Sequence, residues 1–477
     1  MTRRLFALLA APFALLLPGA SRATAPDCRL HAGRWGGLLG EGEGALRLVL
    51  EIDAEGVPTL VSVDQGGARI PATGGSCGPG ELRLEFGAVR GRLEARLDAA
   101  GGTPALTGSW SQGRAMPIRL ERLADAGALP VRPVVTYPPL EQALPQARAQ
   151  GRASALGAGW RSRTGSDVQV DGTRTPDGAA VLPTDLWHVG SITKSMTGTL
   201  LARLVQRGVL AWDQPVAEAV ADAGITVHPQ LRAVTLHQLV TGRSGLATNI
   251  DIARFLTFPK PDPDPVASRL RYAKVMLEGA PETAPGATFT YPNAGFVVAG
   301  FIAERATGRS WEDLMQAEVF TPLGLNSAGF GPPDTARAPH GLAPGMLGGA
   351  PRPFRGYADN PAVLGPAGTV HMTLDDLTRF GLAHARGAAG EGDSAYLPQA
   401  AWRFLHTAPA GSDYAVGWVR QGPDRIWHNG SNTLWLAELR VDLASGHVAA
   451  AAANLADADR SVSAAIEAAG QAAARAG

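Results

Sequence analysis

Apolar and polar residues alternate with a period of two in the first part of the chain. The clearest stretches are "ALRLVLEID" (45–53), "ELRLEF" (81–86) and "GRLEARL" (91–97), and glycine-rich turn sequences separate them. Such alternation is typical of strands that bury one face and expose the other to water. It predicts a small all-β domain over residues 26–124, a barrel or a sandwich of about six to eight strands.

Beyond this part, over residues 140–477, the pattern changes to helical spacing interrupted by short apolar runs. "SMTGTLLARLVQRG" and "FVVAGFIAERATG" have helical spacing and end at glycine, a common helix terminator. Four runs between residues 412 and 456 are predicted as consecutive strands, and a closing helix is predicted for roughly 459–476. These features predict an α+β unit with an antiparallel sheet flanked by helices and a helical subdomain. The proline-rich residues 125–139 predict a linker.

The first 25 residues have the layout of a cleaved export signal. Arg3 and Arg4 precede an apolar run, Leu5 to Leu17, that is too short to span a bilayer easily, and small residues follow it. The paired arginines leave the general secretory and twin-arginine routes both open. We therefore expect a periplasmic or secreted protein with no stable membrane insertion.

Export determines how the two cysteines are interpreted. Cys28 and Cys77 both lie in the predicted β-domain, and an oxidising compartment favours a disulfide between them. The alternative is a pair of unlinked, small core residues.

The charge balance and the histidine spacing argue against a nucleic-acid-binding protein and a metalloenzyme. Lys+Arg and Asp+Glu both number 43, so no global field favours binding to nucleic acid. The ten histidines form no ligand spacing such as H-E-x-x-H, and we expect no metal and no cofactor. The long stretch over residues 331–356 lacks periodicity and is interpreted as either a functional loop or a disordered one.

The candidate chemistry begins at "HVGSITKSMTG" (188–198). The chain has three lysines, and only Lys194 has a serine three residues before it. On a helix, Ser191 and Lys194 would share a face, and a lysine of lowered pKa is able to take the serine proton, whereas an arginine is not. Taken alone, the pair favours a helix-capping serine and a surface lysine, because such capping pairs are common.

Two further motifs follow in order. "FTYPNAG" contains Tyr291 and Asn293 just before an apolar helical pattern, and "WHNGSN" contains His428 and Gly430 on a predicted strand. Alone, each triplet favours an ordinary structural role: a packing tyrosine, a turn asparagine and a core histidine. Because the three motifs occur in the order S-x-x-K, Y-x-N, H-x-G, we interpret them together as parts of one site.

With this ordered set the chain resembles the serine β-lactamase and penicillin-binding-protein superfamily. Within it, the Tyr-x-Asn motif resembles the class C type, with its related D-amino-acid peptidases and carboxylesterases. Further phrases typical of that family are "GVLAWDQPV", "VTLHQLVTGRSGL", "FTPLGL", "GPAGTVHMTLDDLTRFG" and "YAVGW". The resemblance covers roughly residues 140–477 and implies a β-lactamase-like fold there, preceded by the extra β-domain.

The resemblance implies four catalytic residues. Ser191 would be the acylated nucleophile, Lys194 its proton partner, and Tyr291 the base that later activates water. His428 stands where many relatives have lysine, and would stabilise Tyr291 and negative groups of the substrate.

It also implies substrate-binding positions. Asn293 would orient the substrate amide, the backbone amides of Ser191 and Ser431 would form the oxyanion hole, and Gly430 would let the substrate approach the strand edge. Asn454 matches a position that contacts the substrate carboxylate in some relatives.

The expected function is a serine hydrolase that acts through an acyl-enzyme on a small ester, amide or D-amino-acid peptide, with cell-wall peptides among the candidate substrates. Asn429 replaces the hydroxyl residue usual in relatives that hydrolyse β-lactams, which favours an esterase or peptidase over a true β-lactamase. The alternatives are a true β-lactamase and a penicillin-recognising binding protein with little turnover.

Overall fold

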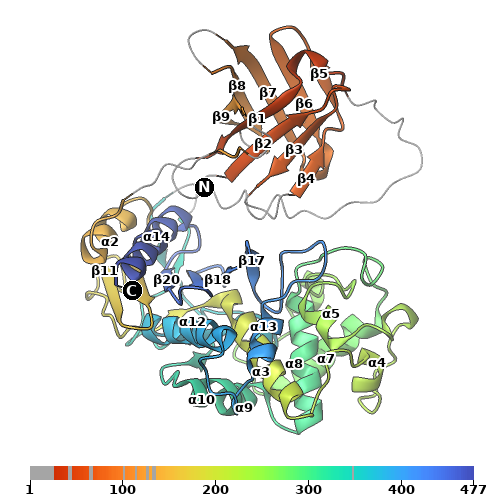
Figure 1. Cartoon of the computed structure of the whole chain (residues 1–477). Coiled ribbons are helices and arrows are strands. Elements are labelled where there is room, and N and C mark those ends of the chain that lie inside the picture. The colour runs from red at the N-terminus through yellow and green to blue at the C-terminus, as the bar shows by residue number, and fades with distance from the viewer. Residues whose placement is uncertain are drawn as a thin grey trace. The chain divides into compact units, whose positions relative to one another are not determined.

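The computed structural model describes residues 26–40, 46–63, 68–99, 103–112, 115–124, 128–130, 136–345 and 349–476. The predicted signal, residues 1–25, and part of the predicted linker lie outside these ranges. The chain divides into two compact units, Met1–Thr136 and Tyr137–Gly477, and the boundary falls within the stretch predicted as a linker (Figure 1).

The amino-terminal unit is one curled antiparallel sheet. Its strands are β1 (Gly33–Leu39), β2 (Leu46–Ile52), β3 (Pro58–Ser62), β4 (Ala68–Pro71), β5 (Gly74–Cys77), β6 (Glu81–Phe86), β7 (Gly91–Asp98), β8 (Ala105–Ser111) and β9 (Ala115–Arg122), in the order β4-β3-β2-β1-β9-β8-β7-β6-β5. The two edge strands, β4 and β5, are joined in the chain by only Ala72 and Thr73, so the sheet curls until its edges meet there. The fold is thus a curled sheet rather than a sandwich, and the strand count exceeds the prediction because one bent segment supplies both edges.

The alternating pattern of the sequence accounts for the core of this unit. In β6, Leu82, Leu84 and Phe86 are buried while the residues between them are exposed. Cys28 and Cys77 form a disulfide with a Cα–Cα distance of 5.2 Å, as predicted. The bond ties the start of the described chain to the edge strand β5.

The second unit contains a six-stranded antiparallel sheet in the order β11-β10-β20-β19-β18-β17. Its strands are β10 (Ala155–Arg161), β11 (Ser166–Gly172), β17 (Val419–Gln421), β18 (Arg425–Ser431), β19 (Leu436–Asp442) and β20 (Val448–Ala453). The short strands β12 (Trp187–His188), β13 (Gly329–Phe330) and β16 (Val370–Met372) form a second sheet, and β14 (Leu342–Ala343) pairs with β15 (Arg352–Pro353).

Helices cover both faces of the six-stranded sheet. They are α2 (Leu140–Arg148) and α14 (Asp459–Ala476) on one face and α12 (Leu374–Ala389) on the other. Strand β20 consists mainly of alanines that alternate between the two faces: Ala449 and Ala451 pack with α14, whereas Ala450 and Ala452 belong to the larger core. Small side chains let helices pack closely on both sides, so the strand is wholly buried.

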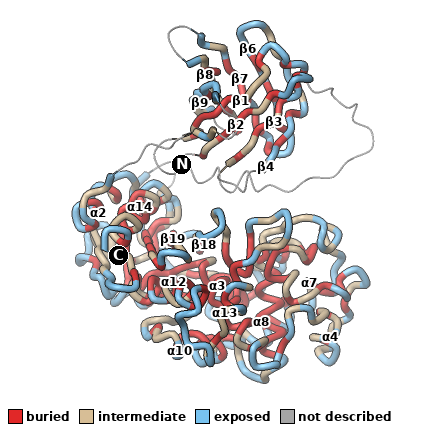
Figure 2. Tube along the Cα trace, viewed as in Figure 1, coloured by how far each residue is buried: buried red, intermediate tan, exposed pale blue. Residues whose placement is uncertain are grey.

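The helical subdomain lies in the chain between β11 and β17. Its longer helices are α3 (Thr193–Gln206), α7 (Pro265–Glu278) and α8 (Asn293–Thr307), and its shorter ones are α4 (Val216–Ala219), α5 (Leu236–Val240), α6 (Ile252–Phe255), α9 (Trp311–Met315), α10 (Thr321–Leu323), α11 (Gly365–Gly368) and α13 (Gln399–Leu405). Both α3 and α8 are buried over most of their length (Figure 2). The α+β architecture with a helical subdomain confirms the fold expected for this part. No helix in the described ranges has the length and hydropathy needed to cross a bilayer.

Candidate functional site

Ser191 lies in a tight turn at the start of α3. The turn is the 3₁₀ helix Gly190–Ile192, and the α-helix begins two residues after Ser191 rather than at it. Gly190 has φ +52°, in the left-handed region, and a Cβ there would lie 2.4 Å from the amide nitrogen of Ser431. Only glycine accommodates this backbone and this contact, which bring the Ser191 turn against β18.

Two side chains hold the peptide before Ser191. The Gly190 amide donates to His188 Nδ1 at 3.1 Å, and Thr193 Oγ1 donates to the Gly190 carbonyl at 2.7 Å. Both groups are buried. The nucleophile turn is therefore fixed by hydrogen bonds on both sides of Gly190.

Lys194 contacts Ser191 directly. Its Nζ donates to Ser191 Oγ at 2.9 Å and to the carbonyl of Ala367 at 2.6 Å, and the side chain has no exposed surface. Burial lowers the pKa of Lys194 well below the usual value of 10.5, because the charged form is poorly solvated there. This geometry and this pKa shift suit a group that takes the Ser191 proton.

Tyr291 faces the same lysine. Lys194 Nζ lies 4.9 Å from the centre of the Tyr291 ring, and Tyr291 is hydrogen-bonded to Ser191. Burial raises the pKa of Tyr291 to about 12, and the bond to Ser191 opposes the rise. The resting phenol is therefore protonated, so any action as a base requires it first to pass its proton on.

Asn293 is the first residue of α8, two residues after Tyr291. Its side-chain amide donates to Asn249 Oδ1 at 2.9 Å, a partner that the motif did not predict. The bond fixes which way the Asn293 carboxamide is oriented.

His428 also lies beside Tyr291, with ring centres 6.4 Å apart. Its Nδ1 lies 2.5 Å from the carbonyl of Asn429, which only accepts, so Nδ1 carries the proton. Nε2 then accepts from the Tyr414 hydroxyl at 3.3 Å. Burial, with Lys194 nearby, lowers the pKa of His428 to about 3. Both ring nitrogens are thus engaged away from Tyr291, and a neutral His428 would act on Tyr291 only through Tyr414, which packs against both rings.

The amides of Ser191 and Ser431 come close because two glycines face each other. A Cβ on Gly430 would lie 2.4 Å from the Ser191 nitrogen and 2.0 Å from the Val189 carbonyl oxygen, the counterpart of the contact made by Gly190. Strand β18 therefore abuts the nucleophile turn, as an oxyanion hole formed by these two amides requires.

Asn454 does not share this arrangement, and its assignment to substrate binding is corrected. The side chain is fully buried at the end of β20. Its Oδ1 accepts from the Ala155 amide at 3.0 Å, and its Nδ2 donates to Ser154 Oγ and the His340 carbonyl, each at 2.9 Å. With these atoms occupied, Asn454 holds the start of β10 instead.

Several residues at the site escaped the sequence reasoning. Tyr414 and Ala367 lie in the phrases "YAVGW" and "GPAGTVHM", which indicated a family but no role. His188 stands three residues before Ser191, and nothing local distinguishes it from an ordinary strand residue. The partners of these groups are far away in the chain, so no local pattern reveals them.

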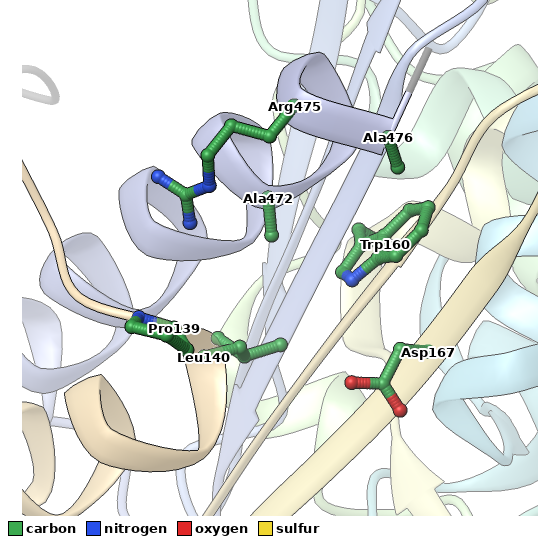
Figure 3. Close-up of a pocket in the computed structure, with 7 residues that line it drawn as sticks. All are labelled: Pro139, Leu140, Trp160, Asp167, Ala472, Arg475 and Ala476. Carbon is green, nitrogen blue, oxygen red and sulfur yellow. The ribbon is translucent and has the colours of Figure 1, made fainter.

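A separate recess of about 270 Å³ lies between α2, α14, β10 and β11 (Figure 3). It is lined by Pro139, Leu140, Trp160, Asp167, Ala472, Arg475 and Ala476. None of these residues belongs to the Ser191 cluster or carries a hydroxyl or thiol group, so the recess does not compete as the site of acyl transfer to serine.

The geometry of the Ser191 cluster agrees with the comparisons to known proteins. The family model "Beta-lactamase" matches residues 168–474, which is more than half of the sequence. The chain belongs to the beta-lactamase family. This confirms the superfamily expected from the motifs, and with it a serine hydrolase of the beta-lactamase fold.

Individual relatives differ in how much of each chain is matched. Penicillin-binding protein 4 of Amycolatopsis lactamdurans is 29% identical over 297 residues, which cover 58% of this chain and 74% of that protein. Esterase EstB of Burkholderia gladioli is 30% identical over 186 residues, covering 36% of this chain and less than half, 44%, of the esterase. The solved structure of the D-amino acid amidase from Ochrobactrum anthropi SV3 has a TM-score of 0.56 at 18% identity, covering 70% of this chain and 98% of the amidase. At that identity the likeness to the amidase shows the fold alone.

Proposed function

We propose that this chain hydrolyses a small ester, amide or D-amino-acid peptide through an acyl-enzyme at Ser191. The observation that carries the proposal is the contact of Ser191 Oγ with the fully buried Lys194 Nζ at 2.9 Å. Burial lowers the pKa of this amine well below 10.5, which makes it a better acceptor for the proton of the serine nucleophile.

The positions of the groups support the following steps. Ser191 Oγ attacks the substrate carbonyl while Lys194 takes its proton, and the amides of Ser191 and Ser431 stabilise the oxyanion. Tyr291, protonated at rest, gives a proton to the leaving group and then recovers one from Lys194. In the second half of the reaction the phenol relays a proton from the attacking water to the Lys194 amine, and Lys194 returns this proton to Ser191 Oγ as the acyl group leaves.

The substrate class is supported by relatives and by Asn429. The relatives include an esterase and a penicillin-binding protein, and D-amino-acid amidases share the fold. Asn429 offers no hydroxyl beside Gly430, so we rank esters and D-peptides above β-lactams. The Cys28–Cys77 disulfide supports export to an oxidising compartment, where cell-wall peptides are accessible.

A labelled fluorophosphonate and a substrate panel test the proposal. Full-length mature protein should be labelled once per chain, and Ser191→Ala should remove the label. Ser310→Ala, which removes a half-buried helix-capping serine at α9, is the matched control and should be labelled normally. Turnover of p-nitrophenyl esters or D-alanyl peptides above that of nitrocefin is the expected ranking. Stable acylation without release would identify a binding protein instead.

A further inference from the structure

The carboxylate of Asp359 lies at the centre of a buried hydrogen-bond network beside the Ser191 turn. Asp359 follows the long stretch after β13, and its side chain has no exposed surface. Its Oδ2 is 2.9 Å from His188 Nε2, and its Oδ1 accepts from Asn432 Nδ2 at 3.0 Å and from the Asn360 amide at 2.7 Å. Both oxygens of the carboxylate therefore accept hydrogen bonds.

One arm of this network reaches the nucleophile turn. A backbone amide only donates, so the bond from the Gly190 nitrogen makes His188 Nδ1 an acceptor and puts the imidazole proton on Nε2. That proton points at Asp359 Oδ2. The carboxylate thus fixes the tautomer of His188, and His188 fixes the peptide immediately before the Ser191 amide.

The other arm reaches strand β18. Asn432 directly follows Ser431 and is nearly fully buried. Its Nδ2 donates to Asp359 and to the Ala358 carbonyl at 3.1 Å, while its Oδ1 accepts from the amides of Leu434 and Trp435, each at 3.2 Å. Asp359 therefore also fixes the segment immediately after the Ser431 amide.

We propose that Asp359 is a positioning residue that sets the separation of the two oxyanion-hole amides. The amides belong to segments 240 residues apart in sequence, and this one carboxylate is bonded to a neighbour of each. Asp359 is itself anchored by Lys260, whose Nζ donates to the Asp359 carbonyl at 3.1 Å. Because donors must point at the developing oxyanion before reaction, a small shift of either amide lowers the acylation rate more than substrate affinity.

Asparagine at position 359 should break this arrangement while keeping its shape. An amide has one oxygen and one NH₂ where the carboxylate has two oxygens, so one of the donors from His188 and Asn432 would face another donor. If the NH₂ faces His188, the imidazole has to move its proton to Nδ1, and the Gly190 amide then faces a donor. If it faces Asn432, the strand arm is released instead.

The test compares Asp359→Asn with Asp376→Asn in the full-length mature protein. Asp376 is a carboxylate of similar burial that accepts from the Ser327 amide and hydroxyl at the start of α12, away from the cluster. Single-turnover measurements separate the substrate Kd from the acylation rate, and fluorophosphonate titration gives the active fraction. The Kd of a boronic acid, which forms a tetrahedral adduct with Ser191, reports the oxyanion hole independently.

The inference rests on the proposed function, and the expected results separate the two. Asp359→Asn should lower the acylation rate per active molecule by about 10²-fold and weaken the boronic acid in parallel, with substrate Kd changed by less than about threefold. Asp376→Asn should leave all three unchanged. If Asp359→Asn does not fold, Asn432→Ala, which removes one arm, should lower acylation by about tenfold, the effect of one hydrogen bond.

Acylation by Asp359→Asn within about twofold of wild type, or an equal loss in Asp376→Asn, would overturn the positioning role. An unchanged acylation rate in folded Asn432→Ala would likewise overturn the positioning role of Asp359. A wild type that forms no acyl-enzyme would instead refute the proposed function itself, and the role of Asp359 with it.

Discussion

Replacing Lys194 by methionine would separate the chemistry of this side chain from its packing. Methionine has a similar length and is apolar, but it has no proton to exchange. In the structure Lys194 is fully buried and, in the described part of the chain, forms no ion pair; desolvation alone accounts for its lowered pKa. The substitution therefore removes a proton acceptor without leaving a buried charge unpaired.

The two consequences differ in size. Loss of a general base costs about 10² to 10⁴ in rate, or about 3 to 5 kcal/mol in the acylation barrier. On the folding side, Ser191 Oγ and the Ala367 carbonyl lose Nζ as a partner, which costs about 1 to 3 kcal/mol. Removing the desolvated amine offsets part of that cost. We expect the acylation rate to collapse while the free energy of unfolding falls by less than about 2 kcal/mol.

The assay is single-turnover acylation by a p-nitrophenyl ester across pH, with urea unfolding of the same samples. Only the unprotonated amine accepts the Ser191 proton, so in the wild type acylation should rise with pH through the pKa of Lys194. Burial places that limb well below pH 10.5. In Lys194→Met the limb should vanish. The control, Lys274→Met, changes a half-exposed lysine on α7 and should behave like the wild type.

A folded Lys194→Met that acylates within about threefold of the wild type, with the same pH limb, would refute the reasoning. Ser191 would then obtain its base elsewhere, and the contact at 2.9 Å would only be structural.

Three other predictions concern stability and domain organisation. Burial lowers the pKa of His406 to about 3 and that of His384 well below 6.5, so below about pH 6.5 the unfolded chain binds protons that the native state excludes. Urea unfolding should therefore show that the pair lowers the free energy of unfolding by about 3 kcal/mol for each unit by which the pH decreases. A His384→Phe/His406→Leu variant with the same pH slope would contradict this. Reduction of the Cys28–Cys77 bond, which spans 49 residues, should destabilise the amino-terminal unit by about 4 kcal/mol, and two free thiols in unreduced, denatured protein would argue against the bond. A chain of residues 137–477 should hydrolyse esters at nearly the full-length rate, since every proposed catalytic group lies in that unit, and a folded but inactive fragment would show that the β-domain contributes to the site.

Local patterns were sufficient for the elements and for the order of the motifs. The alternation in "ELRLEF" appears directly as the buried and exposed residues of β6, because period two is a property of one strand. The closing helix begins and ends close to the predicted bounds. The placement of Lys194 against Ser191 likewise follows from helical spacing, which carries one residue onto the face of the other.

What sequence could not supply depends on contacts between distant residues. Strands β4 and β5 form one bent segment whose two halves pair with opposite edges of a sheet. No local pattern within residues 68–77 predicts this pairing. The pairing of His188 with Asp359 spans 171 residues. Asn454 was misassigned because an asparagine at a strand end has the same local pattern whether it binds a ligand or holds the backbone.

The last prediction concerns Gly430, where one methyl group should abolish activity. Its φ is ordinary, so alanine brings no backbone strain, but the added Cβ would lie 2.0 Å from the Val189 carbonyl oxygen and 2.4 Å from the Ser191 nitrogen. Both are backbone atoms that cannot rotate away, so β18 must separate from the nucleophile turn. Loss of one oxyanion donor costs about 10² to 10³ in rate, and this shift displaces both amides, so Gly430→Ala should lose at least that much. Gly470→Ala is the control, since its Cβ would meet only Ala449 at 4.0 Å and a helix gains about 1 kcal/mol from the change. Single-turnover acylation decides the matter: a folded Gly430→Ala with wild-type acylation would mean that the Ser191 and Ser431 amides do not form the oxyanion hole.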